Sequence, residues 1–173
     1  MPPVFELLQA HHDRQGFDCG KAPLNDFLQR QARQNADRIV GITHISVESA
    51  DDCKILAYYT LVTRVVDAAI IPNKKLPRGE IGVVLLGRLA VDKTRHRKGL
   101  GRLCLTRAIL QVEQSARDIG INALVLDAMD EDARAWYLSL DLGFETLLDS
   151  PMHLYLPVDT IRKIVNEPLD EPA

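Results

Sequence analysis

The sequence predicts an α/β fold in which helices flank a mixed sheet. Hydrophobic residues make up 46% of the 173 residues and charged residues 26%, a composition typical of globular proteins. Segments with alternating or continuous apolar residues, typical of strands, are separated by segments with helical periodicity. In chain order the predicted elements are helix, hairpin, strand, helix, strand, helix and strand. This order favours helices packed around a mixed sheet.

The first half of the chain is predicted to contain a helix and a hairpin. Residues 4–22 form a short extended piece followed by a loop, and apolar residues then recur at helical spacing over 23–37. Residues 42–49 alternate, and after a short turn residues 55–66 continue as a second strand, the pattern of an antiparallel hairpin. Prolines and charges predict a loop over 72–79.

The second half begins with a continuous apolar run at 83–86, which predicts a strand buried on both faces. The next elements are a helix from 101 to 118 that stops near Gly120, a strand at 123–126, a helix from Asp130 to Gly143, and a last strand or hairpin at 144–156. After Pro157 we expect a short helix through Ile164, with residues 160–173 as a fraying tail.

Length and composition predict a single cytoplasmic domain over residues 1–173. No apolar run approaches the roughly 20 residues that span a bilayer, and the start of the chain lacks a basic region followed by an apolar one. The three cysteines, Cys19, Cys53 and Cys104, are odd in number and form no CxxC pair. They predict reduced thiols, with no disulfide framework and no metal site.

The distribution of charge is more informative than the net charge of −3. Six Lys or Arg residues and no carboxylate lie between Lys93 and Arg107. Lys74, Lys75 and Arg78 form a second basic cluster. The mildly acidic total does not by itself indicate a nucleic-acid partner.

The segment HRKGLG at residues 96–101 predicts an anion-binding loop between a strand and a helix. The first N–H groups of that helix lack partners within it, and glycines let a ligand approach the backbone closely. The helix dipole and the neighbouring basic side chains, at Arg95, Arg97, Lys98 and Arg102, favour a pyrophosphate. Two glycines also occur in such turns for shape alone. The pattern is neither GxGxxG nor a Walker loop, since Cys104 stands where a third glycine would fall.

Four motifs in order resemble the GCN5-related N-acetyltransferases, and more narrowly the acetyltransferase toxins of bacterial toxin–antitoxin pairs. They are FDCGKAPLNDFL (17–28), LGRLAVD (86–92), DARAWYLSLDLGF (132–144) and LYLP (154–157). The resemblance implies the family's fold, a mixed, mostly antiparallel sheet with a splayed acetyl-CoA site. It covers residues 17–157, and the combination of motifs is far more specific than any one of them.

The resemblance implies that acetyl-CoA is the co-substrate, without a metal, and that it pairs with the end of one strand. The pyrophosphate then lies on the following loop. The implied cofactor residues are Leu89, Ala90, Val91, Arg95, His96, Arg97, Lys98, Gly99, Leu100, Gly101 and Arg102. The family's loop is usually written [QR]xxGxG, and His96 departs from its first position.

Tyr137 matches the family's tyrosine, which the resemblance implies protonates the departing CoA thiolate. A phenol with an ordinary pKa near 10 can give a proton to a thiolate of similar basicity. Spacing alone favours Tyr137 as a core residue beside Trp136, and the four motifs together favour the chemical role. No general base is evident. An α-amine next to an ester needs none, because its pKa of about 8 or lower leaves a useful neutral fraction.

The acceptor implied by the resemblance is the α-amino group of an aminoacyl-tRNA, whose acetylation blocks translation. Basic residues that could contact tRNA are Lys74, Lys75, Arg78 and Arg33. The implied partners are a ribbon-helix-helix antitoxin and a second copy of the chain in a homodimer. Two alternatives stay open: an acetyltransferase acting on a small amine or a protein N-terminus, and a non-catalytic CoA-binding module. Which tRNA is chosen does not follow from the sequence.

Overall fold

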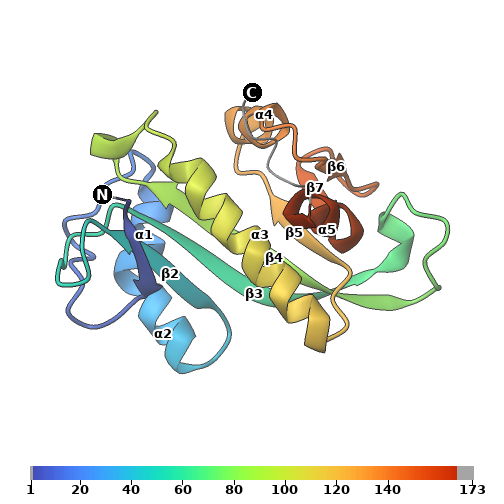
Figure 1. Ribbon diagram of the computed structural model, residues 1–173, viewed down its shortest axis with the longest axis horizontal. Coiled ribbons are helices and arrows are strands. Elements are labelled where there is room, and N and C mark those ends of the chain that lie inside the picture. Colours follow the sequence, from blue (N-terminus) through green and yellow to red (C-terminus); the bar gives the residue numbers. More distant parts are fainter. Residues whose placement is uncertain (1, 167–173) are drawn as a thin grey trace. The chain divides into compact units, whose positions relative to one another are not determined.

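The computed structural model describes residues 2–166 (Figure 1). These residues divide into two compact units. Unit 1 comprises the chain up to Thr63 together with Leu86–Ala108, and unit 2 comprises Arg64–Leu85 together with the chain from Ile109 onward. Both units are therefore discontinuous in sequence.

The predicted α/β class is confirmed by a seven-stranded sheet with the strand order β1-β2-β3-β4-β5-β7-β6. The β1–β2, β2–β3, β5–β7 and β6–β7 pairings are antiparallel. The strands are β1 Val4–Leu7, β2 Ile42–Val47, β3 Ala57–Asp67, β4 Glu80–Val91, β5 Ala123–Asp127, β6 Glu145–Thr146 and β7 His153–Pro157. The helical elements are α1 Ala22–Arg30, α2 Ala32–Asp37, α3 Leu100–Asp118, α4 Glu131–Ser139 and α5 Val158–Asn166, with short 3-10 turns η1 Ala68–Ile70 and η2 Lys93–Arg95.

The hairpin of unit 1 is confirmed, whereas the single helix predicted over 23–37 is wrong. The hairpin strands pair in register from Ile42 with Leu61 to Ser46 with Ala57. The helix is interrupted at Gln31, where φ is −116°. No glycine or proline marks this break. Leu28 in α1 and Ala32 in α2 both reach zero exposure in the core.

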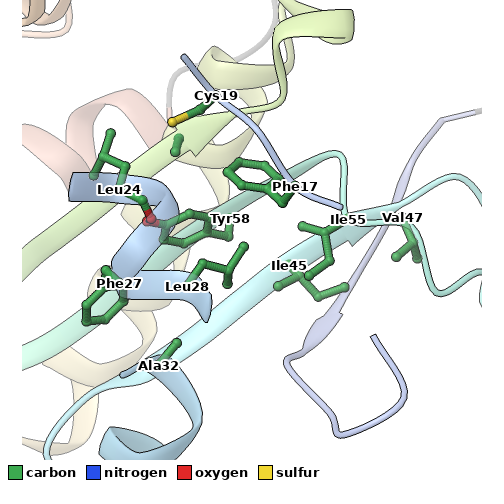
Figure 2. Close-up of a cluster of buried hydrophobic side chains, with 11 residues drawn as sticks. Phe17, Cys19, Leu24, Phe27, Leu28, Ala32, Ile45, Val47, Ile55 and Tyr58 are labelled. Carbon is green, nitrogen blue, oxygen red and sulfur yellow. The ribbon is translucent and has the colours of Figure 1, made fainter. Parts of the chain in front are cut away.

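The core of unit 1 fills the space between α1, α2 and one face of the sheet (Figure 2). Tyr58 lies at its centre, stacked on Phe27 and in edge contact with Phe17. Its hydroxyl donates a 2.7 Å hydrogen bond to the Leu24 carbonyl, so this buried phenol has a partner. The remaining cluster members are Cys19, Leu28, Ala32, Ile45, Val47, Ile55 and Ala90.

The opposite face of the sheet in unit 1 carries a second set of aromatic side chains, those of Tyr59 and Phe5. Neighbouring residues of a strand point to opposite faces, so Tyr59 points away from Tyr58. Tyr59 contacts Phe5 of β1, and the guanidinium of Arg107 in α3 lies 5.1 Å from the Phe5 ring centroid. The first half of α3 therefore covers this face, with helices on both sides of the sheet.

Unit 2 is built on β5 and β7, which pair from Ala123 with Pro157 to Asp127 with His153. A core cluster forms on one face, and β5 and β7 also bury alternate leucines. Gly82 lies where a Cβ would come within 2.8 Å of the Gly120 carbonyl oxygen, so glycine is needed there. α3 ends at Asp118, close to the stop predicted near Gly120, although Gly120 itself has no left-handed φ.

The end of the described chain is helical. The short helix expected through Ile164 extends to Asn166. The rest of the expected frayed tail, residues 167–173, lies outside the described residues. Within residues 2–166, no helix has the length and apolar character needed to cross a membrane.

An ion-pair cluster in unit 2 leads to a pH-dependent prediction. Glu113 of α3 is 7% exposed, and it accepts hydrogen bonds from Arg117 at 3.0 and 2.9 Å. Arg162 of α5 lies 3.8 Å away. The hydrogen bond from Arg117, and then the charges of both arginines, outweigh desolvation and lower the pKa of Glu113. A lowered acid pKa stabilises the fold above the unfolded pKa of about 4.3, and that stability is lost as pH falls below it.

We therefore expect Glu113→Gln to lower Tm by about 2–4 °C at pH 7 and by much less at pH 3. Thermal unfolding monitored by circular dichroism at the two pH values tests this. The exposed Glu80→Gln variant is the control and should leave Tm unchanged at both. An equal loss at pH 7 and pH 3 would contradict the charge-based account.

Candidate functional site: a basic loop, a buried tyrosine and a basic pocket

The predicted anion-binding loop leaves the end of β4 in unit 1. The backbone N–H of Asp92 donates to the Leu56 carbonyl at 2.9 Å, which fixes the last position before the loop. Its carboxylate then caps η2, accepting from the Thr94 N–H at 3.0 Å and from the Thr94 hydroxyl at 2.7 Å. The chain thus turns sharply within three residues of the strand.

The loop backbone adopts two left-handed residues before α3 begins. Arg97 has φ of 59° and Gly99 has φ of 80°. Gly99 takes this conformation at little cost because it has no Cβ, whereas at Arg97 it is strained. α3 then starts at Leu100. Its first N–H groups have no partners within the helix, and its dipole favours negative charge at this end.

Several loop side chains are tied to the protein itself. His96 Nε2 lies 2.8 Å from the Val91 carbonyl oxygen, which can only accept, so this nitrogen donates. Arg95 forms an ion pair with Glu48, and Lys98 Nζ donates to the Thr94 carbonyl at 3.2 Å. His96, which replaces the Gln or Arg usual at the first position of the family's loop, therefore has a structural role, because its side chain holds the loop to the end of β4.

The FDCG motif contacts the start of the loop, which sequence reasoning did not reveal. The Asp18 N–H donates to Asp92 Oδ2 at 3.1 Å, and the Lys93 N–H donates to the Asp18 carbonyl at 2.8 Å. Lys93 Nζ lies 2.7 Å from Asp18 Oδ2, and Asn25 Nδ2 donates to Asp18 Oδ1 at 2.9 Å. The motif was recognised by resemblance, but nothing in its spacing indicated the residue that it contacts.

Both carboxylates of this network are held ionised. Hydrogen bonds from Lys93, Asn25 and Gly20 keep the pKa of Asp18 well below its usual range. At Asp92 burial opposes ionisation, but the hydrogen bonds from Thr94 and from the Asp18 N–H outweigh it and lower the pKa. The acids thus balance part of the positive charge of the basic loop.

A small pocket of about 160 Å³ lies against the loop in unit 1. It is lined by Pro3, Glu48, Leu56, Arg95, Lys98, Gly99, Leu100 and Leu103. Leu89, Ala90 and Val91 form the end of β4, and of these Ala90 is buried in the unit 1 core. The eleven predicted cofactor residues therefore all lie within residues 89–102 of unit 1, with Arg33 elsewhere in the same unit, in α2.

Tyr137 lies in α4 of unit 2. Asp130 begins this helix by accepting from the Ala133 N–H at 2.8 Å, as the acids at its start predicted. Tyr137 is 9% exposed and makes edge contacts with Trp136 and Phe144. These contacts fix the ring orientation, so both a packing role and a chemical role are compatible with its position.

The second basic cluster lies on the unit 2 loop between η1 and β4. Lys74, Lys75 and Arg78 are all exposed. A pocket of about 720 Å³ lies beside them, and its lining includes Lys74 and Arg78. The apolar part of the lining is Ala68, Ala69, Ile71, Pro72, Leu76, Pro77 and Leu148. The lining thus combines two basic side chains and the carboxylate of Asp67 with mostly apolar residues.

Within the described chain, Glu6, His11 and His12 form a group of three side chains that could hold a metal ion. Their hydrogen bonds have another explanation. His12 Nδ1 accepts from the Gln9 N–H at 2.9 Å, so the proton is on Nε2, which donates to Glu6 Oε1 at 2.8 Å. A metal at Nε2 would require a protonated Nδ1, which would face another donor. The arrangement fits a histidine–carboxylate hydrogen bond better than a metal centre.

Known proteins that resemble this chain include toxins described with tRNA or with acetyl-CoA. No protein-family model matches the chain. The tRNA-acetylating toxin of Mycobacterium tuberculosis is 31% identical over 158 residues, which cover 90% of this chain and 92% of the toxin. AtaT complexed with acetyl-methionyl-tRNAfMet has a TM-score of 0.87 and 29% identity, over 95% of this chain and all of AtaT. A Tyr-to-Phe mutant of AtaT, bound to acetyl-CoA and to the C-terminus of the antitoxin AtaR, has a TM-score of 0.84 and 27% identity, over 95% of this chain and 99% of AtaT.

The fold and the loop after β4 define the class of GCN5-related N-acetyltransferases, as the resemblance implied. Within that class, the extent of the similarity identifies a narrower group. The chain belongs to the tRNA-acetylating toxins of toxin–antitoxin systems.

Proposed function

We propose that this protein transfers the acetyl group of acetyl-CoA to the α-amino group of an aminoacyl-tRNA and thereby blocks translation. The observation that carries the proposal is the similarity over 95% of the chain to AtaT, whose structure has been solved in complex with acetyl-methionyl-tRNAfMet. The whole chain is then one acetyltransferase domain that acts in the cytoplasm, where charged tRNA is found.

The loop of residues 95–102 is proposed to hold the CoA pyrophosphate. The start of α3 at Leu100, where a helix offers N–H groups to an anion, and the left-handed φ of Gly99 support this assignment. Arg97, Lys98 and Arg102 would add charge, whereas Arg95 is already paired with Glu48. Backbone of Leu89, Ala90 and Val91 would pair with the pantetheine arm and polarise the thioester carbonyl.

Tyr137 is proposed as the general acid of the reaction. The neutral α-amine attacks the thioester carbon, a C–N bond forms, and the C–S bond breaks. The Tyr137 hydroxyl gives its proton to the departing CoA thiolate, and the new amide loses its extra proton to solvent. Removing the charge from the thiolate as it forms lowers the barrier to its departure.

Recognition of tRNA is assigned to Lys74, Lys75, Arg78 and Arg33. Three of these side chains are exposed on one loop, where phosphates can reach them. The net charge of −3 is compatible with this assignment because the basic residues are clustered. As further parts of the proposal, the protein forms a homodimer that combines the basic surfaces of two copies, and a ribbon-helix-helix antitoxin covers it.

The test is acetyl transfer in vitro with purified protein, labelled acetyl-CoA and a pool of charged tRNAs. We expect label on the amino acid of charged tRNA and none on uncharged tRNA. Label on a small amine or a protein N-terminus, with charged tRNA unmodified, would replace the proposal with another acetyltransferase activity. Tight CoA binding without transfer to any amine would indicate a non-catalytic module.

A further inference from the structure

We infer that Asp18 and Asp92 are positioning residues that hold the acetyl-CoA loop in its binding conformation. This inference rests on the proposed function, because it assumes that residues 95–102 bind the CoA pyrophosphate. Neither aspartate is itself assigned a contact with the cofactor. Their effect is exerted through the path of the backbone that enters the loop.

Asp92 joins two segments that are far apart in the sequence. Its Oδ1 accepts both the N–H and the hydroxyl of Thr94, which sets the η2 turn. Its Oδ2 accepts the N–H of Asp18, 74 residues away. Asp92 is 4% exposed, so these hydrogen bonds are what make a buried carboxylate tolerable. Removing the carboxylate would release both segments at once.

Asp18 completes the connection in the reverse direction. Its carbonyl accepts the Lys93 N–H at 2.8 Å, while its side chain accepts from Lys93 Nζ, from Asn25 Nδ2 and from the Gly20 N–H. Two hydrogen bonds of the Asp18 main chain thus join the FDCG motif to the entrance of the loop: its N–H donates to the Asp92 carboxylate, and its carbonyl accepts from the Lys93 N–H.

The FDCG side of this connection is rigid because its neighbours are buried. Phe17 is 2% exposed and Cys19 is 7% exposed, and both belong to the core around Tyr58 (Figure 2). The Cys19 N–H also donates to Asn25 Oδ1 at 3.0 Å, which fixes this segment to the first turns of α1. Asp18 therefore connects the buried core of unit 1 to the loop through its hydrogen bonds.

Further hydrogen bonds connect the entrance of the loop to its anion-binding end. The Arg95 N–H donates to the Asp92 carbonyl at 2.8 Å, and Lys98 Nζ donates to the Thr94 carbonyl. Strain at Arg97 means that the loop adopts its shape only while neighbouring contacts hold it. Without the aspartates, part of the CoA binding energy would be used to order the loop.

The experiment compares wild type, Asp92→Asn, Asp18→Asn and the exposed hairpin-turn control Asp51→Asn in full-length protein. In Asp92→Asn an amide NH₂ can face the Asp18 N–H, donor against donor. Calorimetry with CoA should give a Kd raised about tenfold or more in both test variants and unchanged in Asp51→Asn. Steady-state kinetics should show a raised KM for acetyl-CoA and a kcat within about threefold of wild type.

A truncated donor separates positioning of the loop from general damage. Acetyl-pantetheine lacks the pyrophosphate, so kcat/KM for this donor should be the same in wild type and in both variants. Equal losses with both donors, or CoA Kd values within twofold of wild type, would overturn the inference. If Asp92→Asn does not fold, as judged by circular dichroism, the half-exposed Asp18→Asn decides the question. If wild type itself binds no CoA, the proposed function fails together with the inference.

Discussion

Tyr137→Phe is expected to lower kcat for acetyl transfer to charged tRNA by about 10²–10⁴-fold and to leave the Kd for acetyl-CoA unchanged. The substitution removes only the hydroxyl. The ring contacts with Trp136 and Phe144 are retained, so the fold should keep its stability. In cells, expression of the variant should no longer arrest growth. Single-turnover transfer and CoA calorimetry measure the two quantities separately.

A matched control is Tyr155→Phe in β7 of the same unit. Tyr155 is 2% exposed, and burial, with a hydrogen bond to Glu145, raises its pKa. Loss of this hydroxyl should cost some thermal stability and leave kcat within about twofold, because the group has no assigned part in the reaction. A wild-type kcat in the Tyr137→Phe variant would contradict the general-acid role and would leave Tyr137 with a packing role alone.

Reversing charge at Lys74 and Lys75 together is expected to raise KM for charged tRNA about tenfold or more at physiological salt. Each lost phosphate contact also reduces the dependence of binding on salt. A plot of log K against log salt should therefore have a slope smaller by about 2 in the double variant. KM for acetyl-CoA should not change, since the two lysines lie outside the loop of residues 95–102. Binding measured by filter retention at four salt concentrations gives the slope.

Lys163→Glu supplies the control for nonspecific charge effects. This lysine is exposed on α5 and belongs to neither basic cluster. It should change the salt slope little. If Lys163→Glu weakened tRNA binding as much per charge as the double variant, the loop of Lys74 and Lys75 would not be a specific tRNA contact.

The α/β class and most elements could be predicted because their signals are local. Alternation in residues 42–49 and the continuous apolar run at 83–86 report directly on burial along a strand. The break at Gln31 could not be predicted, since no glycine or proline marks it. Short 3-10 turns likewise depend on a single capping carboxylate, as at Asp92.

Some residues of the candidate site could be predicted and others could not, because only some of them belong to a local sequence pattern. Gly99 and the basic residues around it could be found from composition and spacing, and Tyr137 from resemblance. The contact of Asp18 with Asp92 joins residues 74 positions apart, and no periodic pattern encodes it. The role of His96 could not be predicted from the sequence either. Its side chain donates to a main-chain carbonyl, which every residue has, so no particular residue type marks the partner.

The discontinuity of the two units has a consequence for synthesis of the protein. Unit 1 needs Leu86–Ala108 to complete it, and unit 2 needs β7 and α5. The ribosome adds residues in chain order, at roughly 5–20 each second. The proposed cofactor loop is thus completed in unit 1 before the strands that complete the unit carrying Tyr137 have been made. A nascent chain therefore holds only half of the proposed catalytic machinery until β7 and α5 have been added.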